Sequence, residues 1–578
     1  MYENIITEIN TQNWSMAEYE LKKYLNPTNT NKKIFINDTL CILAATIYQH
    51  MQNEEEAFYW ITEGLKYNIK NYELYLLLGN YYENKNIAQA WLCYENAEFY
   101  CSNDEDFAII SEFKNNIKAA LKKPIPKISI IILSYNKLEM TKACIESIRK
   151  NNLPSSYDLI VVDNASDDGS KEWLEKQDDI KLICNKENMG FPYGCNQGIE
   201  ISNSETDIFL LNNDTIVAPG SVFWLRMGLY SGNYVGATGS VSNRVSNDQN
   251  VDGCGNTLES CMEYAIFHNV PMKYPYEEKS YLIGFALMIK RDAINVTGLL
   301  DTRFSPGTYE DNDYCIRLHN AGWKVLLCKN SFIYHDKQVQ ANSKLWRSLY
   351  TINLNKFTEK WNFNIDYYSY VNTNIINLIK APEHSKIKVL EIGCGLGMTL
   401  SKIQSLWHNS DLYGIEANPE VAKITSKYLN VIQGNAETME ISFTPGTFDY
   451  IILTDILVNI INPCDLLRRF MPYLKPDGMY LCSIPNLMHT SVLFPLLFEG
   501  KFNYQDSGIL DKAHLRFFTL ESIVALFNSC NLAIKNFLGV PLVNEEDEQK
   551  LTKLESLLDL PSKQQFITYQ YVFSAKKK

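Results

Sequence analysis

Acidic residues at predicted strand ends are the first feature of this chain that could do chemistry. Residues 208–211 form an apolar run of buried-strand character that stops at Asn212-Asn213-Asp214. A carboxylate at the mouth of a buried strand is where an α/β fold places a metal or a phosphate. Further along come Glu310 and Asp311, and then His335. Carboxylates and an imidazole together suit a divalent cation and a general base, whereas any one of them alone would be read as a turn or a solvated loop.

The segment that carries these residues alternates between strands and helices. This alternation predicts a parallel sheet with helices on both faces, in which ligands bind at the carboxyl ends of the strands. Asp163 directly follows the second strand, so we expect it at that edge. The strands are predicted at 128–133, 158–162, 180–184 and 208–211, with helical spacing over 139–150.

Ordered motifs in this segment resemble those of family 2 glycosyltransferases of the GT-A fold, most closely the rhamnosyltransferase-like branch. The resemblance covers about residues 125–365. It implies inverting transfer of a sugar, with rhamnose as one candidate, from a nucleotide-diphosphate donor. The motifs are the runs 128–136, 161–170, 188–191, 194–198 and 211–214, and Tyr309-Glu310-Asp311 with Arg317 and 321–323.

The resemblance implies a donor-binding set at the strand ends. Asp163 resembles the acid that accepts hydrogen bonds from the nucleobase and the ribose. Tyr135 is placed to stack on the base. Asn188, Gly190 and Arg317 belong to the same expected set.

A divalent cation, Mn²⁺ or Mg²⁺, is expected at the diphosphate, because the phosphates repel carboxylates and each other. Asp214 resembles the last acid of an Asp-x-Asp motif, and Asn212 stands where the first acid would be. His335 resembles the family's late metal-binding histidine. The alternative for His335 is a plain loop histidine.

Asp311 resembles the catalytic base, and Glu310 is its first substitute. Inversion needs one carboxylate to take the proton of the acceptor hydroxyl, without a covalent intermediate. Either Asp313 or Arg317 is expected to orient this base. The alternative is that Glu310 and Asp313 only cap the helix that includes Ile316.

A second strand–helix alternation opens with a glycine turn. Gly393, Gly395 and Gly397 directly follow a strand that contains Glu391. The Gly-x-Gly-x-Gly spacing departs from the dinucleotide fingerprint, which disfavours a dehydrogenase. The next strand ends at Glu416, a carboxylate placed to bind two ribose hydroxyls.

A third strand with the turn Asn435-Ala436 and a fourth strand that ends at Asp455 continue the alternation. With the runs 483–486 and 511–519, these features resemble class I S-adenosylmethionine-dependent methyltransferases across about residues 375–578. Either His489 or His514 could take a proton from a sugar hydroxyl, or each could be a structural histidine bonded to backbone. The resemblance implies that S-adenosylmethionine is the cofactor and that it is bound by Glu391, Gly393, Gly395, Gly397, Glu416, Asn435, Ala436 and Asp455.

Residues 1–122 read as consecutive helices with an internal repeat. The offset from Ala45 to Gly79 is 34 residues, the period of a tetratricopeptide helix pair in which small residues let two helices touch. The region resembles a short tetratricopeptide array, with an unrelated helical bundle as the alternative. We expect it either to dock a protein partner or to pack onto the next domain.

Composition excludes several classes of protein. The net charge of -13 argues against a nucleic-acid binder. No apolar run reaches the roughly 18 residues of a transmembrane helix, while association with a membrane surface stays open. The cysteines are scattered without a Cys-x-x-Cys, and the N-terminal residues do not resemble a signal peptide, so a cytoplasmic protein is predicted.

The sequence as a whole predicts a multidomain enzyme of helical and α/β parts. These are a tetratricopeptide-like domain at 1–122, a GT-A glycosyltransferase domain at 125–365 and a Rossmann-like class I methyltransferase domain at 366–578. The expected function is bifunctional: a sugar is transferred to a glycan or to a glycoprotein such as flagellin, and a glycan hydroxyl is O-methylated. The alternatives are a scaffold of a glycan-assembly complex with one active catalytic head, or methylation of a protein or lipid.

Overall fold

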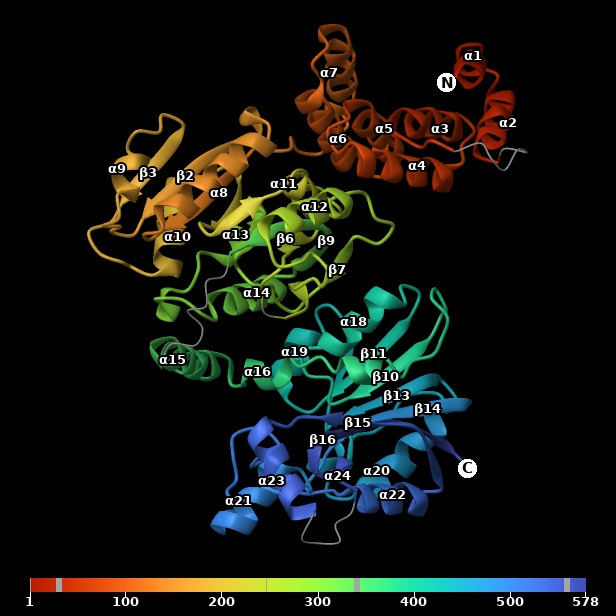
Figure 1. The fold of residues 1–578 in the computed structure, drawn as a ribbon, viewed down its shortest axis with the longest axis vertical. Helices are drawn as coiled ribbons and strands as arrows, with labels where there is room; N and C mark the ends of the chain where they lie inside the picture. Colours follow the sequence, from red (N-terminus) through yellow and green to blue (C-terminus); the bar gives the residue numbers. More distant parts are fainter. Residues whose placement is uncertain (1, 27–33, 246, 337–343, 556–561) are drawn as a thin grey trace. The chain divides into compact units, whose positions relative to one another are not determined.

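The computed structural model describes residues 2–26, 34–245, 247–336, 344–555 and 562–578. The chain separates into two compact units, Met1–Lys356 and Phe357–Lys578, each with its own hydrophobic core (Figure 1). Unit 1 joins a helical region to an α/β domain, and unit 2 is a second α/β domain. The predicted fold class is therefore confirmed.

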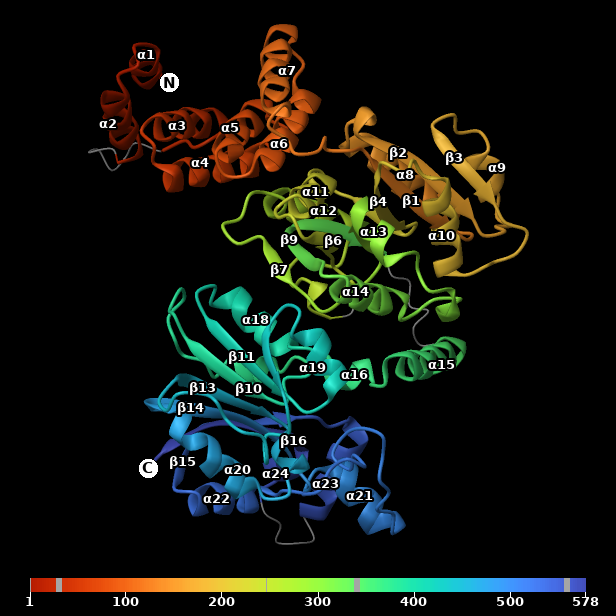
Figure 2. The ribbon, with the colours of Figure 1, turned by 180° about the vertical axis from the view of Figure 1, so that it is seen from behind.

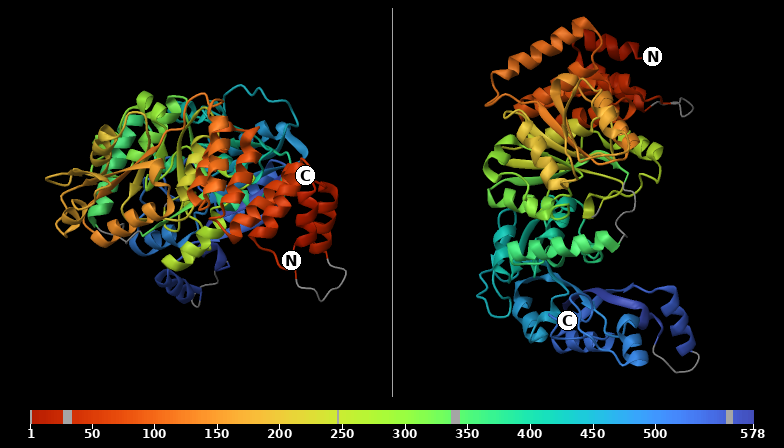
Figure 3. Two further views of the ribbon diagram at one scale, coloured as in Figure 1. Left: turned by 90° about the horizontal axis from the view of Figure 1, so that it is seen from above. Right: turned by 90° about the vertical axis from the view of Figure 1, so that its left-hand side faces the viewer.

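The N-terminal region consists of helices that lie side by side (Figure 3). Asparagine side chains begin α3 to α7 by accepting a hydrogen bond from a backbone N–H of the first turn, as helix caps do. Gly79 lies so close to Tyr94 that a Cβ would fall 2.2 Å from a ring carbon, the expected pairing of a small with a large residue. In the described residues the helices are α1 (Glu3–Asn10), α2 (Trp14–Leu25), α3 (Asp38–His50), α4 (Glu54–Tyr67), α5 (Tyr72–Glu83), α6 (Ile87–Tyr100) and α7 (Asp104–Lys118).

The helical region packs onto α11 (Ser221–Leu229), a helix of the neighbouring α/β domain whose residues are all buried. Phe223, Trp224 and Met227 of α11 join the core of the N-terminal helices. Gln89 of α6 donates to the carbonyl of Met227 at 2.9 Å. A helix that is buried all round needs partners on every side. Packing onto the next domain, one of the two arrangements expected for this region, is the one observed.

The α/β domain of unit 1 is a mixed sheet in the order β3-β2-β1-β4-β8-β6-β9-β5, with β7 beside β9. The first four strands are parallel, as predicted, but β8 and the strands beyond it introduce antiparallel pairs that the sequence pattern did not indicate. The strands are β1 (Ile128–Ser134), β2 (Tyr157–Asp163), β3 (Ile180–Cys184), β4 (Asp207–Asn212), β5 (Thr215–Val217), β6 (Val235–Val241), β7 (Tyr276–Glu278), β8 (Ala286–Ile289) and β9 (Lys324–His335).

Helices cover both faces of this sheet, as expected (Figure 2). Ile130 and Ile132 of β1 share one core with α8 (Leu138–Asn151), whereas Ile131 shares another with α10 (Phe191–Ile201), because successive side chains of a strand point to opposite faces. The other helices are α9 (Ser170–Leu174), α12 (Leu258–His268), α13 (Arg291–Thr297), α14 (Glu310–Asn320) and α15 (Lys344–Trp361), which continues into unit 2.

Unit 2 has a sheet in the order β12-β11-β10-β13-β14-β16-β15, parallel from β12 to β14 and antiparallel at β16 and β15. Its strands are β10 (Lys388–Ile392), β11 (Asp411–Glu416), β12 (Asn430–Gln433), β13 (Phe448–Thr454), β14 (Leu474–Pro485), β15 (Leu532–Pro541) and β16 (Thr568–Lys577). Its longer helices are α18 (Met398–Leu406), α19 (Pro419–Thr425), α20 (Pro463–Phe470), α21 (Thr490–Glu499), α22 (Leu520–Ser529) and α23 (Glu545–Glu555), and α24 (Gln564–Ile567) is short.

Two short helices, α16 (Ile365–Tyr368) and α17 (Thr373–Ile376), lie between α15 and β10. Asn372 caps the start of α17 by accepting from the N–H of Ile375 at 3.1 Å.

Two further expectations concern cysteines and the membrane. Cys464 of α20 and Cys530 are paired across a sequence separation of 66 residues, and the other twelve cysteines are free. Among the described residues, no helix combines the length and the apolar character needed to cross a bilayer.

Breaking the ion pair between Arg226 of α11 and Glu95 of α6 tests how much the stability of unit 1 depends on its helical region. Both side chains are largely buried. Glu95→Ala should therefore lower the free energy of unfolding by about 3–5 kcal/mol, because it leaves a buried guanidinium without its charge partner. Asp292→Ala, which breaks the exposed pair with Lys123, is the matched control and should change it by less than about 1 kcal/mol. Equal effects in urea unfolding monitored for unit 1 would contradict this dependence.

Candidate active sites

Asp163 ends β2 and is buried at the carboxyl edge of the parallel strands. Its Oδ2 accepts from the backbone N–H of Ser166 at 3.1 Å, while Oδ1 has no hydrogen-bond partner among the described residues. A buried carboxylate oxygen without a donor is costly, so this position fits a ligand that brings an N–H or O–H group. A nucleobase and a ribose carry such groups.

The loops around Asp163 are fixed to one another by hydrogen bonds. Asn136 donates its N–H to Ser166 Oγ at 2.8 Å, and its own Oδ1 accepts from the N–H of Asp167 at 2.9 Å. Tyr135, which precedes Asn136, is 50% exposed. The β1–α8 and β2–α9 loops thus present an accessible ring beside a buried acid, the arrangement expected for a stacked base.

Asn188 and Gly190 shape the loop before α10. Asn188 Oδ1 accepts from the N–H of Gly190 at 3.0 Å. Gly190 has a positive φ of 84°, and a Cβ there would lie 2.7 Å from the Cα of Pro306. The N–H of Phe191 donates to the carbonyl of Pro306 at 2.7 Å. These contacts join the α10 loop to the segment that leads into α14.

Asp214 and His335 meet as the sequence predicts, because β5 and β9 pair antiparallel with Thr215 opposite His335. The distance from His335 Nε2 to Asp214 Oδ1 is 3.2 Å. His335 Nδ1 lies 3.2 Å from the carbonyl of Arg244, which can accept its proton, and Nε2 faces the carboxylate. A carboxylate oxygen and an imidazole nitrogen at this distance suit two ligands of one divalent cation.

The described residues contain no group of three or more His, Cys, Asp and Glu side chains arranged for a metal. A cation at Asp214 and His335 would therefore take its other ligands from a bound diphosphate and water. Asn212 adds backbone contacts: its N–H donates to the carbonyl of Phe285 at 2.9 Å, and its carbonyl accepts from Thr215 Oγ1 at 2.7 Å. Lys137 Nζ lies 4.0 Å from Asp214 Oδ2, a cation that we did not predict although it directly follows the first motif.

Glu310 and Asp311 begin α14, where Glu310 is buried and Asp311 is half-buried. Asp311 accepts from the N–H of Gly284 at 2.8 Å and from its neighbour Asn312 at 2.8 Å. Burial raises the pKa of Asp311, and burial together with the charge of Asp311 raises the pKa of Glu310 to about 8. Oxygen Oε2 of Glu310 has no partner in the described part of the chain. Carboxylates with raised pKa values are suited to accept a proton near neutral pH.

Arg317 does not reach these carboxylates through any of its hydrogen bonds. Its Nε donates to Asp313 at 2.8 Å, and its other nitrogens donate to the carbonyls of Thr297 and Leu299 at 2.9 and 2.8 Å. These bonds tie α14 to the end of α13 rather than to Asp311. Gly284 and Asn312 hold Asp311 instead. The expected place of Arg317 in the donor-binding set stays a prediction.

The glycine turn of unit 2 wraps around Glu416, the last residue of β11. Glu416 accepts from the N–H of Gly395 at 2.9 Å and from that of Asn418 at 2.8 Å. Gly395 has a φ of 53°, and a Cβ there would lie 2.5 Å from the carbonyl oxygen of Tyr368. Gly393 and Gly397 also have positive φ values. Each carboxylate oxygen of Glu416 keeps a further lone pair, which fits two ribose hydroxyls.

Glu391 lies in β10 beneath this turn and is almost completely buried. Thr454 donates to its Oε1 at 3.3 Å, and Oε2 has no partner among the described residues. Burial, with a contribution from the charge of Glu416, raises the pKa of Glu391 to about 8. An orphaned buried carboxyl at this place fits the ammonium group of a methionine-like ligand.

The other predicted residues of unit 2 differ in accessibility. Asn435 is exposed and its Oδ1 accepts from the N–H of Glu437 at 2.8 Å, whereas Ala436 is buried in the core. Asp455 follows β13 with a φ of 51° and accepts from Ser483 Oγ at 2.8 Å and from Gln570 Nε2 at 2.6 Å. Gln570 was not predicted, because it lies in the last strand of the chain and no local motif marks it.

The two candidate histidines have different environments. His489 is buried with both ring nitrogens bonded, Nδ1 to Ser491 and Nε2 to the carbonyl of Leu542, so the structure corrects its assignment to a proton acceptor in favour of a cap of α21. His514 is half-buried, and its Nδ1 lies 3.0 Å from the carbonyl of Ile509. The proton therefore belongs on Nδ1, which leaves Nε2 able to accept one.

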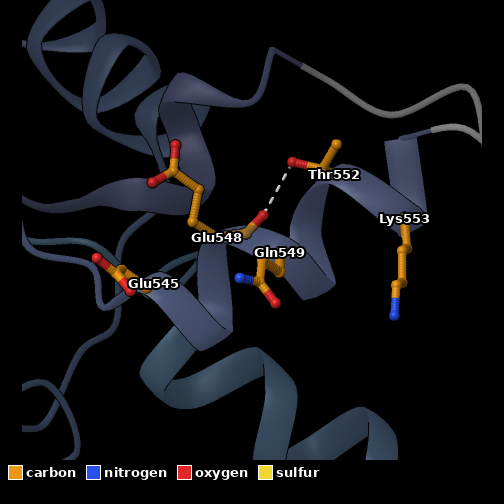
Figure 4. Close-up of a pocket in the computed structure, with 5 residues that line it drawn as sticks. All are labelled: Glu545, Glu548, Gln549, Thr552 and Lys553. Atoms are coloured by element: carbon orange, nitrogen blue, oxygen red, sulfur yellow. Dashed lines mark hydrogen bonds between the residues drawn. The ribbon is translucent and has the colours of Figure 1, made fainter.

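A surface hollow on α23 is unrelated to these sites. It is lined by Glu545, Glu548, Gln549, Thr552 and Lys553, and Thr552 Oγ1 donates to the carbonyl of Glu548 at 2.9 Å (Figure 4). No strand end or glycine turn contributes to it.

Each unit thus places buried acids at the carboxyl ends of parallel strands, as nucleotide- and cofactor-binding α/β enzymes do. Residues 129–298 match the sequence model of glycosyl transferase family 2, and residues 366–535 match that of a methyltransferase domain. The chain therefore contains a family 2 glycosyltransferase domain and a methyltransferase domain.

Individual proteins match parts of the chain. Glycosyltransferase AglE of Haloferax volcanii is 28% identical over 214 residues, which are 35% of this chain and 64% of that protein. The mitochondrial ubiquinone biosynthesis O-methyltransferase of Schizosaccharomyces pombe is 28% identical over 103 residues, 17% of this chain and 37% of that protein. The chain thus spans less than two thirds of either relative.

A solved structure overlaps the chain only loosely. The mannosyltransferase PcManGT of Pyrobaculum calidifontis aligns with 55% of this chain and 81% of its own, at 14% identity and a TM-score of 0.32. A TM-score this low does not identify a fold, so the domain assignment rests on the two sequence models and on the strand order.

The raised pKa of Glu391 predicts a specific dependence of stability on pH. The folded-state pKa of about 8 lies above the value of an unfolded glutamate, roughly 4.3. The folded protein holds the extra proton between these values, so the stabilisation is full below the lower value and is lost as the pH rises through the upper one.

Glu391→Gln stays neutral at every pH. Relative to the wild type, its melting temperature should therefore be higher at about pH 8.5 than at about pH 5.5, by roughly 2–4 °C for each kcal/mol. Differential scanning calorimetry of unit 2 unfolding measures this, with the exposed Glu545→Gln as control. A difference between variant and wild type that does not change with pH would show that Glu391 is ionised in the folded state.

Proposed function

We propose that this chain transfers a sugar from a nucleotide-diphosphate donor with inversion and also O-methylates a glycan hydroxyl with S-adenosylmethionine. The observation that carries the proposal is that each unit has a buried carboxyl at the edge of its parallel strands with an oxygen that lacks a partner among the described residues, Asp163 in unit 1 and Glu391 in unit 2. Asp163 lies within the residues matched by the glycosyl transferase family 2 model, and Glu391 lies within those matched by the methyltransferase model.

For sugar transfer, we assign nucleoside binding to Asp163 and Tyr135. Asp214 and His335 would hold Mn²⁺ or Mg²⁺, which offsets the charge of the diphosphate. Asp311 takes the proton of the acceptor hydroxyl, because the N–H of Gly284 fixes its orientation and its raised pKa matches that task. Only one carboxylate is needed for inversion. The charge of Asp311, together with burial, raises the pKa of Glu310 to about 8, so Glu310 serves as a buried neighbour of the base.

For methylation, we assign the ribose hydroxyls to Glu416, the ammonium group to Glu391 and the adenine side to Asn435 and Ala436. S-adenosylmethionine supplies an electrophilic methyl group when it is bound. His514 takes the proton from the sugar hydroxyl at Nε2. Asp455 interacts electrostatically with His514 and would stabilise the imidazolium that forms when His514 takes this proton. We therefore propose that Asp455 acts beside the acceptor and does not bind the cofactor.

The domains proposed are 1–122, 125–365 and 366–578, and the first is proposed to be tetratricopeptide-like. Its packing on α11 supports a structural role, and its outer face remains the candidate surface for a protein partner. The proposal also includes a donor sugar such as rhamnose. The acceptor is a polysaccharide precursor or a glycoprotein such as flagellin, and the proposed location is the cytoplasm. The motif resemblance supports the donor sugar, and the many unpaired cysteines support the location.

Asp311→Asn tests the sugar-transfer site. The amide cannot accept a proton, so the transfer rate should fall roughly 10²–10⁴-fold while the affinity for the nucleoside diphosphate is kept. Product mass spectrometry with a panel of nucleotide sugars, together with calorimetry of nucleotide binding, measures both quantities. Glu310→Gln is the matched control. Near-normal turnover of Asp311→Asn with loss in Glu310→Gln would reassign the base to Glu310.

Glu416→Ala tests the methyltransferase site and its independence. Loss of the acceptor for two ribose hydroxyls should weaken S-adenosylmethionine binding at least about tenfold in calorimetry. Glu416→Gln, which keeps one oxygen acceptor, should lose less. The glycan made by Glu416→Ala should lack only its methyl group. Loss of sugar transfer in a folded Glu416→Ala protein would mean that the two activities share one site.

A further inference from the structure

An aromatic surface lies beside the proposed base of unit 1. Tyr309 immediately precedes Glu310 and has a φ of 68°, an unusual backbone conformation for a tyrosine. Its ring contacts that of Tyr350 on α15, with centroids 5.0 Å apart. Tyr309 is buried and Tyr350 is 42% exposed, so the buried ring next to the carboxylates supports an accessible one. Strained residues of this kind concentrate at functional sites.

Helix α15 is held against the segment that carries Tyr309. Asn353 is buried and its Nδ2 donates to the carbonyls of Phe304 and Gly307 at 2.7 and 2.8 Å. Lys356 Nζ donates to the carbonyl of Arg303 at 2.7 Å. These bonds fix the position of α15 relative to the loop that leads into Asp311, so Tyr350 is not a loosely placed surface ring.

A second exposed ring lies on the same face of α15. Trp346, Tyr350 and Asn353 are spaced i, i+4 and i+7, which places them on one side of a helix. Trp346 is 37% exposed. Asn353 faces the loop before α14. Trp346 lies on the same side of α15 as Asn353 and Tyr350, so it extends the exposed surface of Tyr350 by one further helical turn. The result is a strip of two exposed aromatic rings that begins at the ring of Tyr309, the residue that precedes Glu310 and Asp311.

We infer that Tyr350 and Trp346 form the binding surface for a pyranose ring of the acceptor glycan. A pyranose has an apolar C–H face, which suits the flat face of an aromatic ring, and a rim of hydroxyls, which suits nearby carboxylates. A peptide acceptor fits less well, because a helix offers no strand edge for backbone pairing. The inference rests on the proposed sugar transfer and extends it to the class of acceptor and the residues that recognise it.

The test is saturation-transfer NMR with methyl glycosides of common hexoses and the full chain, in the presence of a nucleoside diphosphate and Mn²⁺. We expect contact signals from the C–H protons of at least one glycoside. Tyr350→Ala should weaken that binding at least about threefold, whereas Tyr350→Phe should bind like the wild type, because it keeps the ring. Tyr234→Ala removes a ring that is 68% exposed elsewhere in unit 1 and is the matched control.

Each outcome decides the inference. Loss in Tyr350→Ala with retention in Tyr350→Phe and Tyr234→Ala supports it, and the same pattern in the KM for an acceptor glycan extends it to turnover. Unchanged glycoside binding in Tyr350→Ala, equal loss in Tyr350→Phe, or binding of peptides with no glycoside binding in the wild type overturns it. Failure of the proposed function is separate, since it would appear as a wild-type chain that binds no nucleoside diphosphate.

Discussion

Both sites depend on one constraint: their buried carboxylates receive only some of the hydrogen bonds that their oxygens can accept. Removing a carboxylate from water is expensive unless donors replace the lost hydration. Asp311 and Glu416 obtain such donors from the backbone N–H groups of Gly284 and Gly395, at 2.8 and 2.9 Å. Within the part of the chain that the structure describes, Asp163 and Glu391 each keep an oxygen without a donor. The fold therefore spends stability on groups whose missing partners a ligand can supply.

Loop geometry follows from this requirement. A tight turn at a strand end can bring backbone N–H groups close to a carboxylate, and glycine allows the positive φ angles that such turns often use. Gly395 meets this need in unit 2, where a Cβ would collide with the carbonyl of Tyr368. In unit 1, Gly190 allows the α10 loop to contact Pro306 and thereby positions the segment that leads to Glu310. The glycines of both motifs thus serve the placement of acids.

Helices on two flanks of the first site help to hold it in position. The helix α11 lies under the sheet that carries Asp214 and His335, and it is buried on its outer side by the N-terminal helices. On the opposite flank, α15 holds the loop before α14 through Asn353. A reactive carboxylate with a raised pKa needs fixed surroundings, because water that entered a loosened site would lower that pKa again.

The sequence by itself determined the strand ends, the glycine turns and the acids placed there, because these depend on residues that are neighbours in the chain. It also indicated that Asp214 and His335 would meet. Only the tertiary structure decided which partners several side chains bind. Arg317 binds Asp313 and two carbonyls, and His489 caps α21. Gln570 reaches Asp455 across a sequence separation of 115 residues. The antiparallel half of the first sheet and the aromatic strip of α15 were likewise invisible in the sequence. Such contacts join residues that are distant in the chain, and local patterns of hydrophobicity and motif spacing carry no information about which distant partners meet.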